Sequence, residues 1–384
     1  MYVHPIKWKG MLLMGTNITI LGGGNGAFAA ASHLTIEGHS VTLYESPQFK
    51  DSIKGICELG GINLRTLPSN GLKEGFARLR CITTDIKKAL KDAEIIFVIV
   101  PSFAHENIAK LSAPYLHNGQ LVVTAPGNMY GCIHFAHIVK QSGNYSDILY
   151  ADLDCMMYAC RKMNETSVWL RGYKHGLGCG VFPANKTSEV FERIHKIYPY
   201  FVKRDNVLAT GISNPNFAVH IPVMLFNISN IDNKRDMLFY RECFTPSIGL
   251  IVDAIDRERM AFTREGIFSL QDLLTQDREW YGYQGASGNS VAEIQANNPI
   301  YPTSKLPLNK YHRYITEDVP YGLIPAIELL ELFHLPHKTM SMLADTACIL
   351  CDRDFYKEAI TLRSIGLEGL SGKELLDYVQ YGDR

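Results

Sequence analysis

Three small residues after a short apolar stretch have the spacing with which proteins hold a dinucleotide. They are Gly22, Gly24 and Ala27, in a run that continues Gly22-Gly-Gly-Asn-Gly26 before Ala27. Gly22 permits a sharp turn, Gly24 lets the backbone approach a pyrophosphate, and Ala27 allows a helix to pack closely on a strand. Asn25 and Gly26 begin that helix, whose free N–H groups attract phosphate. We expect these five residues to bind the cofactor.

A single acidic residue, Glu45, ends the next apolar stretch. It lies roughly 20 residues after the glycines, where a carboxylate accepts the ribose hydroxyls. A 2′-phosphate would be repelled by this charge, and no Arg or Lys follows Glu45 until Lys50. The sequence therefore predicts NAD(H) rather than NADP(H). The alternative is a plain glycine turn, but the strand, helix, second strand and acid together favour a dinucleotide site.

A second group of ionisable residues lies far along the chain. His220 occurs in an apolar stretch between Pro215 and Pro222, and Arg313 and Asp318 share a later polar segment. His220 would exchange a proton near neutral pH, Asp318 would orient its ring, and Arg313 would clamp a carboxylate. Each has an ordinary alternative: a lone histidine is usually a core residue, the aspartate could cap a helix, and the arginine could be a surface charge. Together they match a hydride-transfer enzyme, which needs a proton carrier and a substrate anchor.

Two proline-marked turns follow apolar runs rich in β-branched residues. Pro101 comes after one run, and Pro126 and Gly127 come after the next. Open α/β sheets bind ligands at the carboxyl ends of their strands, so we expect these residues to face the cofactor. His105 lies just beyond Pro101 and would touch nicotinamide or substrate, or else be a polar loop histidine.

The apolar pattern predicts two different halves. Strands and helices alternate through the first half, which predicts a doubly wound parallel sheet. From residue 214 the apolar residues recur mainly at helical spacing, which predicts an all-α second half. The expected fold is an α/β Rossmann-type domain over 16–205, preceded by an extension over 1–15 and followed by a helical domain over 206–384.

The individual elements are predicted from the same pattern and from turn residues. After the glycine motif, the expected strands cover residues 79–83, 94–100, 120–124, 147–158, 178–182 and 207–211. The expected helices cover residues 86–90, 106–116, 188–198, 217–230, 248–264, 321–333, 338–350 and 373–381. Residues 46–70 are expected to form a short helix and an irregular excursion.

Composition excludes several classes of partner. The 384 residues carry a net charge of −1 and no basic block, which argues against nucleic acid and anionic membranes. The nine cysteines are mostly scattered, which indicates reduced thiols and a cytoplasmic location. The CxxC pair Cys348 and Cys351 lies in an apolar helical run and is expected in the core, with no metal. The expected partners are small-molecule substrates, with a homodimer as a possible assembly.

The chain resembles the octopine/nopaline (opine) dehydrogenase family over nearly its whole length. The stretches that carry the resemblance are Gly22-Gly-Gly-Asn-Gly26, Val100-Pro-Ser-Phe-Ala-His105, Ala125-Pro-Gly-Asn128, Tyr158-Ala-Cys-Arg161, Asn214-Pro-Asn216 with His220, and Arg313-Tyr-Ile-Thr-Glu-Asp318-Val-Pro-Tyr-Gly322. The resemblance implies that His220 and Asp318 form a catalytic pair and that Arg313 binds substrate carboxylate. It also implies a cleft between the two domains. Asn214 and His105 are the further expected substrate-binding residues.

The leading hypothesis is an NADH-dependent opine dehydrogenase. Such an enzyme condenses an amino acid with an α-keto acid such as pyruvate and reduces the imine to an N-(carboxyalkyl) amino acid. The alternatives are another two-domain NAD(P)-dependent dehydrogenase, like ketopantoate reductase or glycerol-3-phosphate dehydrogenase, or a non-catalytic NAD(H)-binding sensor. Those dehydrogenases place a lysine on the central helix of the second domain, whereas residues 217–231 contain none.

Overall fold

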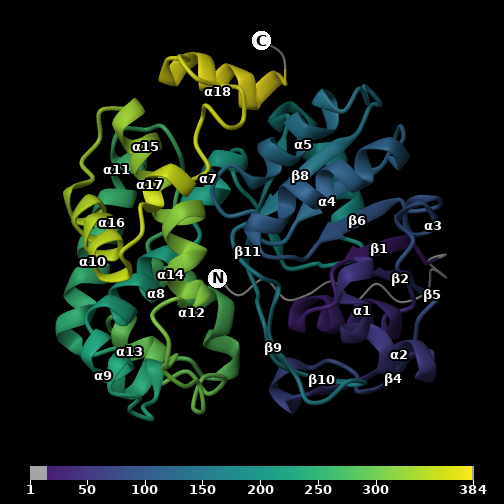
Figure 1. Cartoon of the computed structure of the whole chain (residues 1–384), viewed down its shortest axis with the longest axis horizontal. Coiled ribbons are helices and arrows are strands. Elements are labelled where there is room, and N and C mark those ends of the chain that lie inside the picture. Colours follow the sequence, from purple (N-terminus) through teal and green to yellow (C-terminus); the bar gives the residue numbers. More distant parts are fainter. Residues whose placement is uncertain (1–14, 383–384) are drawn as a thin grey trace.

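The computed structural model describes residues 15–382. The expected extension over 1–15 lies outside the described residues except for Gly15. The chain forms a sheet half (residues 15–203) and a helical half (residues 207–382), which lie side by side (Figure 1). The expected fold class, a Rossmann-type α/β domain followed by an all-α domain, is confirmed.

An eight-stranded sheet forms the centre of the sheet half, in the order β12-β11-β8-β7-β6-β1-β2-β5. All neighbours are parallel except β8 and β11, which are antiparallel. Its central strands are buried and consist mainly of Ile, Val, Leu and Phe, as expected for a sheet covered on both faces. The strands are β1 (Asn17–Leu21), β2 (Ser40–Tyr44), β5 (Cys81–Thr83), β6 (Ile95–Val98), β7 (Leu121–Thr124), β8 (Leu149–Leu153), β11 (Leu177–Phe182) and β12 (Phe201–Lys203).

Helices connect these strands, and one of them, α3 (Ile86–Leu90), starts with a side-chain N-cap. Asp85, expected to cap the helix before residue 90, accepts a hydrogen bond from the Lys88 N–H. The helices are α1 (Asn25–Ile36), α2 (Lys54–Leu59), α3 (Ile86–Leu90), α4 (His105–Ser112), α5 (Gly131–Gln141) and α6 (Thr187–Ile194), with 3-10 turns η1 (Pro47–Ile53) and η3 (Ser102–Ala104).

A second, four-stranded sheet packs on α1, away from the main sheet. It contains β3 (Gly61–Thr66), β4 (Gly75–Arg78), β9 (Tyr158–Lys162) and β10 (Ser167–Tyr173) in the order β4-β3-β10-β9. The expectation of an irregular excursion over residues 46–70 is therefore wrong where β3 forms. This strand pairs with β10, about 100 residues later, so its partner cannot be read from the local sequence.

The expectation of a strand over residues 207–211 is also wrong, because α7 (Val207–Ile212) is a helix. The Asn206 side chain accepts hydrogen bonds from the N–H groups of Leu208 and Ala209, at 2.9 and 3.1 Å. This N-cap starts a helix in spite of the β-branched residues that suggested a strand.

The helical half contains the helices expected over residues 217–230, 248–264, 321–333, 338–350 and 373–381, most of them shorter than predicted, together with further helices that the pattern does not predict. They are α7, α8 (Pro215–Leu225), α9 (Ile228–Asp232), α10 (Pro246–Arg259), α11 (Ala261–Arg264), α12 (Leu273–Tyr281), α13 (Val291–Ala296), α14 (Arg313–Thr316), α15 (Ile324–Leu332), α16 (Lys338–Cys351), α17 (Phe355–Glu358) and α18 (Gly372–Tyr381), with the 3-10 turn η7 (Gly282–Gln284) and π turns η6 (Phe239–Cys243) and η8 (Val319–Leu323). No helix within residues 15–382 is long and apolar enough to span a membrane.

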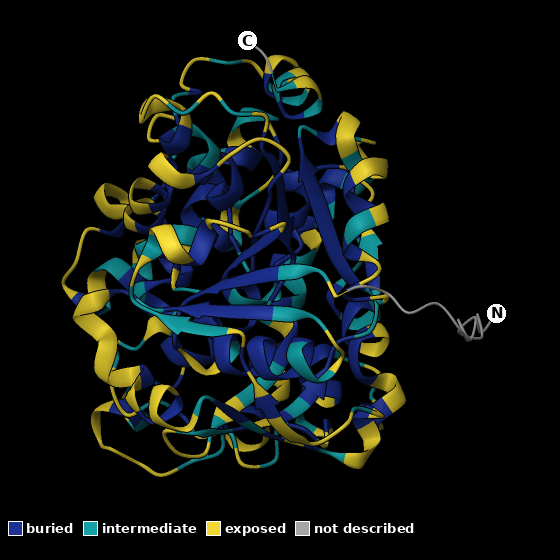
Figure 2. Cartoon of the chain, turned by 90° about the vertical axis from the view of Figure 1, so that its right-hand side faces the viewer, coloured by how far each residue is buried: buried dark blue, intermediate teal, exposed yellow. Residues whose placement is uncertain are grey.

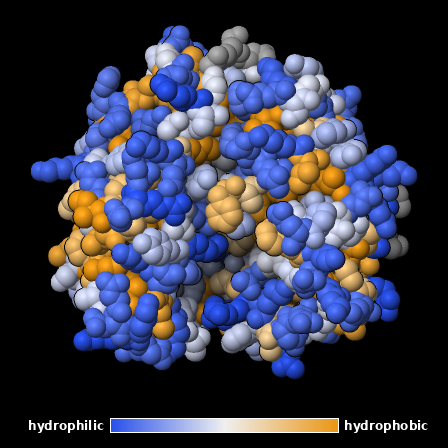
Figure 3. All heavy atoms as spheres, viewed as in Figure 1, coloured by the Kyte–Doolittle hydropathy of each residue, from blue (hydrophilic) through white to orange (hydrophobic). Residues whose placement is uncertain are grey.

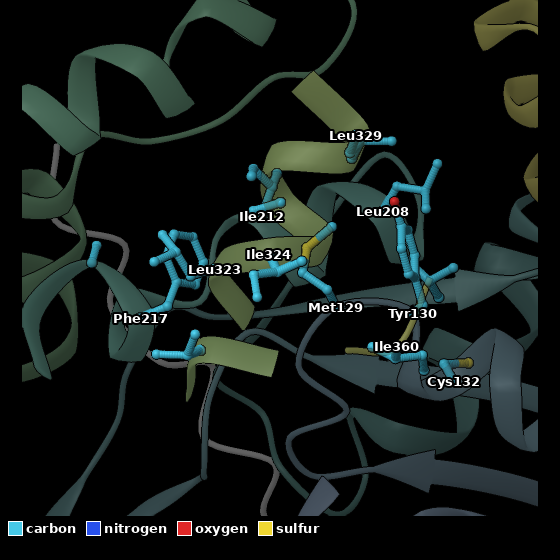
Figure 4. Close-up of a cluster of buried hydrophobic side chains, with 14 of the residues drawn as sticks. Met129, Tyr130, Cys132, Leu208, Ile212, Phe217, Leu323, Ile324, Leu329 and Ile360 are labelled. Atoms are coloured by element: carbon cyan, nitrogen blue, oxygen red, sulfur yellow. The ribbon is translucent and has the colours of Figure 1, made fainter. Parts of the chain in front are cut away.

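One hydrophobic core continues from the sheet half into the helical half. Met129 and Tyr130, which follow β7, belong to the same buried cluster as Phe217 and Leu323 of the helical half (Figure 4). The Met129 N–H also donates to the Tyr321 carbonyl at 3.0 Å. Buried residues fill the strands, and exposed residues lie on the outer helices (Figure 2). The shared core holds the two halves together next to the cleft.

Candidate active site

The structure brings His220 and Asp318 into direct contact across 98 positions of sequence. His220 Nδ1 lies 2.7 Å from Asp318 Oδ2, and both side chains are less than one-tenth exposed. His220 lies on α8, and Asp318 immediately precedes η8. The two residues that the sequence singled out thus form one buried acid–base pair.

Aromatic rings fix the plane of the His220 imidazole. Tyr314 stacks on it with centroids 3.7 Å apart and an angle of 18°, and Phe239 meets it edge-on at 5.9 Å. Within residues 15–382, His220 makes its side-chain hydrogen bond through Nδ1 alone. Nε2 is therefore the ring atom left for substrate.

Arg313 begins α14, one turn before Glu317. Its side chain is 59% exposed, and Nη1 lies 3.7 Å from Glu317 Oε2. His312 caps the helix and is uncharged near neutral pH, since burial first, and then Arg313 and His220, lower its pKa to about 4. The Arg313 guanidinium is therefore the accessible cation on this segment and can bind a carboxylate.

A chain of hydrogen bonds joins the two halves beside this pair. The Ser102 N–H and Oγ–H donate to Glu317 Oε1 at 3.0 and 3.2 Å. Asn128 Nδ2 donates to Ser102 Oγ, and Asn214 Nδ2 donates to Asn128 Oδ1. Asn214 Oδ1 also caps α8 through the Asn216 N–H. The expected substrate-binding residue Asn214 is thus engaged within the protein, and it positions the helix that carries His220.

Within residues 15–382, His105 makes no hydrogen bond or ring contact with the His220–Asp318 pair. It is buried at the start of α4, and a Cβ on Gly131 of α5 would lie 3.1 Å from its Nδ1. Burial, followed by the charge of His134, lowers the pKa of His105 to about 4. Its Nε2 has no hydrogen-bond partner in the described part of the chain. His105 is therefore an uncharged residue of the sheet half and offers substrate no free surface.

Pro101, Pro126 and Gly127 do lie at the carboxyl ends of β6 and β7, as expected. A buried carboxylate that the sequence reasoning missed holds the second of these turns. Asp152 Oδ1 accepts hydrogen bonds from the Gly127 N–H at 2.7 Å and from Thr124 Oγ at 2.9 Å. Burial raises the pKa of Asp152 to about 8. The sequence signal for this carboxylate is an acidic residue, Asp152, within the otherwise apolar segment that forms β8.

The glycine turn has the features that a dinucleotide requires. Gly22 has φ +128°, and a Cβ there would lie 2.3 Å from the Ile99 carbonyl oxygen. A Cβ on Gly24 would meet nothing within 4 Å, and no side chain caps α1 at Gly24. The start of α1 therefore has both free space and backbone N–H groups that no side chain caps. These two features fit a pyrophosphate.

Glu45 immediately follows β2 beside this turn, where a carboxylate fits the ribose. Its Oε1 accepts a hydrogen bond from the Ser46 N–H at 2.7 Å, and burial raises its pKa. Ala27 is fully buried in α1, and Gly26 faces Met156, whose Cε would lie 2.8 Å from an added Cβ. Glu45, Gly26 and Ala27 thus lie around the glycine turn.

Two more arginines lie near the pair and were not assigned from the sequence. Arg161 on β9 pairs in register with Trp169, and Arg171 lies at the irregularity of β10 between Leu170 and Gly172. Their positive charges act on the Tyr314 hydroxyl. Neither forms an ion pair within residues 15–382, and Arg171 Nε is buried without a partner. The space between the two halves is hollowed (Figure 3).

A nucleotide turn in one half and an acid–base pair in the other define an NAD-dependent dehydrogenase. Comparison with known protein families supports this class. Residues 203–351 match the model of the NAD/NADP octopine/nopaline dehydrogenase alpha-helical domain, and residues 17–127 match that of the NAD-dependent glycerol-3-phosphate dehydrogenase N-terminus.

Relatives that match over nearly their full length identify the family within this class. An opine dehydrogenase of Arthrobacter sp. (strain 1C) is 30% identical over 361 residues, which cover 94% of this chain and 98% of that protein. Solved structures of octopine dehydrogenase with NADH and agmatine, and with NADH and pyruvate, superpose with TM-scores of 0.75 and 0.69 at 19% identity, each over 96% of this chain and 98% of the other. The chain belongs to the opine dehydrogenase family. It is an NAD-dependent oxidoreductase that acts on CH–NH groups, so the enzyme class named in the leading hypothesis is confirmed.

Proposed function

We propose that this enzyme joins the amine of an α-amino acid to the carbonyl of an α-keto acid, with pyruvate the first candidate. The amine and the carbonyl lose water to form an imine, and the imine carbon then gains a hydride while its nitrogen gains one proton. When bound at the glycine turn, NADH supplies the hydride. The observation that carries the proposal is the buried 2.7 Å contact between His220 and Asp318.

His220 is the proton carrier in this account. Asp318 accepts from Nδ1, so the proton stays on that atom and Nε2 is left as the basic atom. In the oxidation direction Nε2 takes the proton of the secondary amine, and in the reductive direction it returns one. The stacked Tyr314 ring keeps Nε2 in a fixed direction.

Arginines from both halves suit the charge of the product, which carries two carboxylates. Arg313 would bind one of them, because its guanidinium is 59% exposed. Arg161 and Arg171, whose charges also act on the Tyr314 hydroxyl, would bind the second. The octopine dehydrogenase solved with NADH and pyruvate supports a keto-acid substrate.

We assign cofactor binding to residues 16–205 and substrate binding mainly to residues 206–384. All nine cysteines are free thiols, which supports a reducing, cytoplasmic location.

The test is NADH oxidation at neutral pH with pyruvate plus each amino acid in turn, against pyruvate alone. Oxidation that requires both partners, with an N-(carboxyethyl) amino acid as product, would establish the reaction and identify the amine. Oxidation with pyruvate alone would make the enzyme an ordinary 2-hydroxy-acid dehydrogenase and overturn the proposal.

A further inference from the structure

Strand β9 of the small sheet lies against the glycine turn. The Lys162 N–H, at the end of β9, donates to Asn25 Oδ1 at 2.8 Å. Asn25 is the first residue of α1, so this bond ties the strand to the start of the nucleotide-binding helix. Lys162 thereby reaches the cofactor site from 117 positions beyond Glu45 in the sequence.

The Lys162 ammonium is held above the same turn. Its Nζ donates to the Ser52 carbonyl at 2.9 Å, approaches the Gly23 carbonyl at 3.5 Å, and lies 3.7 Å from the centroid of the Phe28 ring. These contacts give the cation a defined position.

Glu45 occupies the same small space. A Cβ on Gly23 would lie 2.6 Å from Glu45 Oε2 and 2.9 Å from Ser52 Oγ, so the carboxylate closely flanks the turn whose carbonyl Lys162 approaches. The two opposite charges also act on each other. An acid at the end of this strand marks the ribose 2′ position, and NADP-binding relatives of the fold place a basic residue nearby.

We propose that Lys162 is a cofactor-specificity residue that would pair with a 2′-phosphate, and that Glu45 masks it. The preference for NADH over NADPH is then the outcome of two opposed charges. Lys162 is then the basic residue near the ribose 2′ position, although the first basic residue after Glu45 in the sequence is Lys50. The inference rests on the dinucleotide site and is independent of the amine substrate.

A double-mutant cycle tests this pairing. Dissociation constants for NADH and NADPH are measured by fluorescence titration, without substrates, for the wild type, Glu45→Gln, Lys162→Met and the double variant. We expect Glu45→Gln to strengthen NADPH binding at least tenfold. In the double variant, we expect NADPH binding to be strengthened less than threefold. NADH binding should show no such dependence on Lys162.

Controls separate a charge effect from a structural one. Lys162→Arg keeps the charge and should retain the NADPH gain, and Lys162→Gln keeps a hydrogen-bond donor and should lose it; thermal melting confirms that each variant folds. Lys50→Met should leave the gain intact. The same gain with and without Lys162, or its loss in Lys50→Met, would overturn the proposal. A negative result in the substrate panel would leave these binding data interpretable.

Discussion

The two halves present different chemistry to the cleft between them. The sheet half offers uncapped backbone N–H groups and small residues at the start of α1. The helical half offers ionisable side chains, His220 and Asp318, held 2.7 Å apart. The difference separates two tasks, since one half is built to bind a phosphate and the other to move a proton. Substitutions in each half should therefore change different measured quantities.

The largest effect on cofactor binding should come from Gly24→Asp in the sheet half. Aspartate is a favourable N-cap and a Cβ at Gly24 meets nothing within 4 Å, so the apoprotein should melt at an unchanged or higher temperature. Its carboxylate would repel the pyrophosphate and weaken NADH binding by roughly 100-fold, or about 3 kcal/mol. Gly282→Asp, equally open around its Cβ, is the control and should leave NADH affinity unchanged in the same fluorescence titration.

The next effect is expected for Asp318→Asn in the helical half. An amide no longer holds the proton on Nδ1 of His220 by charge, so turnover should fall by roughly 10²-fold while NADH affinity stays within a factor of two. Steady-state kinetics and NADH titration of one preparation would check both. Unchanged turnover would remove Asp318 from the proton-transfer step.

Ser102→Ala tests the link between the halves. It removes the hydroxyl that accepts from Asn128 and donates to Glu317, so kcat/KM should fall by about tenfold and stability by about 1 kcal/mol. Ser112→Ala is the matched control, since the buried Ser112 hydroxyl has no partner within the described chain. Equal effects of the two substitutions would mean that the link does not position the site.

The last expected effect is on the dependence of stability on pH and leaves the reaction itself aside. The Asp152 carboxyl shifts from 3.8 to a pKa of about 8 on folding, because it is buried. Between these values the folded state retains a proton that the unfolded state has lost, so stability should fall as the pH rises from about 4 to about 8. Asp152→Asn should flatten this slope and raise stability at pH 8 by on the order of 2 kcal/mol. Melting temperatures across this pH range provide the check, and an unchanged slope would contradict the assignment.

Some of these features can be read from the sequence because they are local. The glycine turn, the Asp85 cap and the apolar strands depend on neighbours within a few residues. His220, Arg313 and Asp318 were found by residue type, as the chemistry needs a base, a cation and an orienting acid.

Features that depend on distant pairing could not be read in this way. Strand β3 forms because it pairs with β10. Residues 207–212 form a helix because the Asn206 side chain caps it. Lys162 lies at the glycine turn because the small sheet places it there. The Ser102 to Glu317 bond spans 215 positions, and local spacing carries no signal for it. The positions of His105 and Asn214 depend on the same kind of tertiary contact.

The central claim is that the helical half carries the proton transfer, and His220→Ala tests it most directly. Initial rates of amino-acid-dependent NADH oxidation and the dissociation constant of NADH should be measured on the same preparation. We expect turnover to fall by roughly 10²- to 10⁴-fold, with the NADH dissociation constant nearly unchanged. Near-normal turnover in a folded His220→Ala variant would contradict the account.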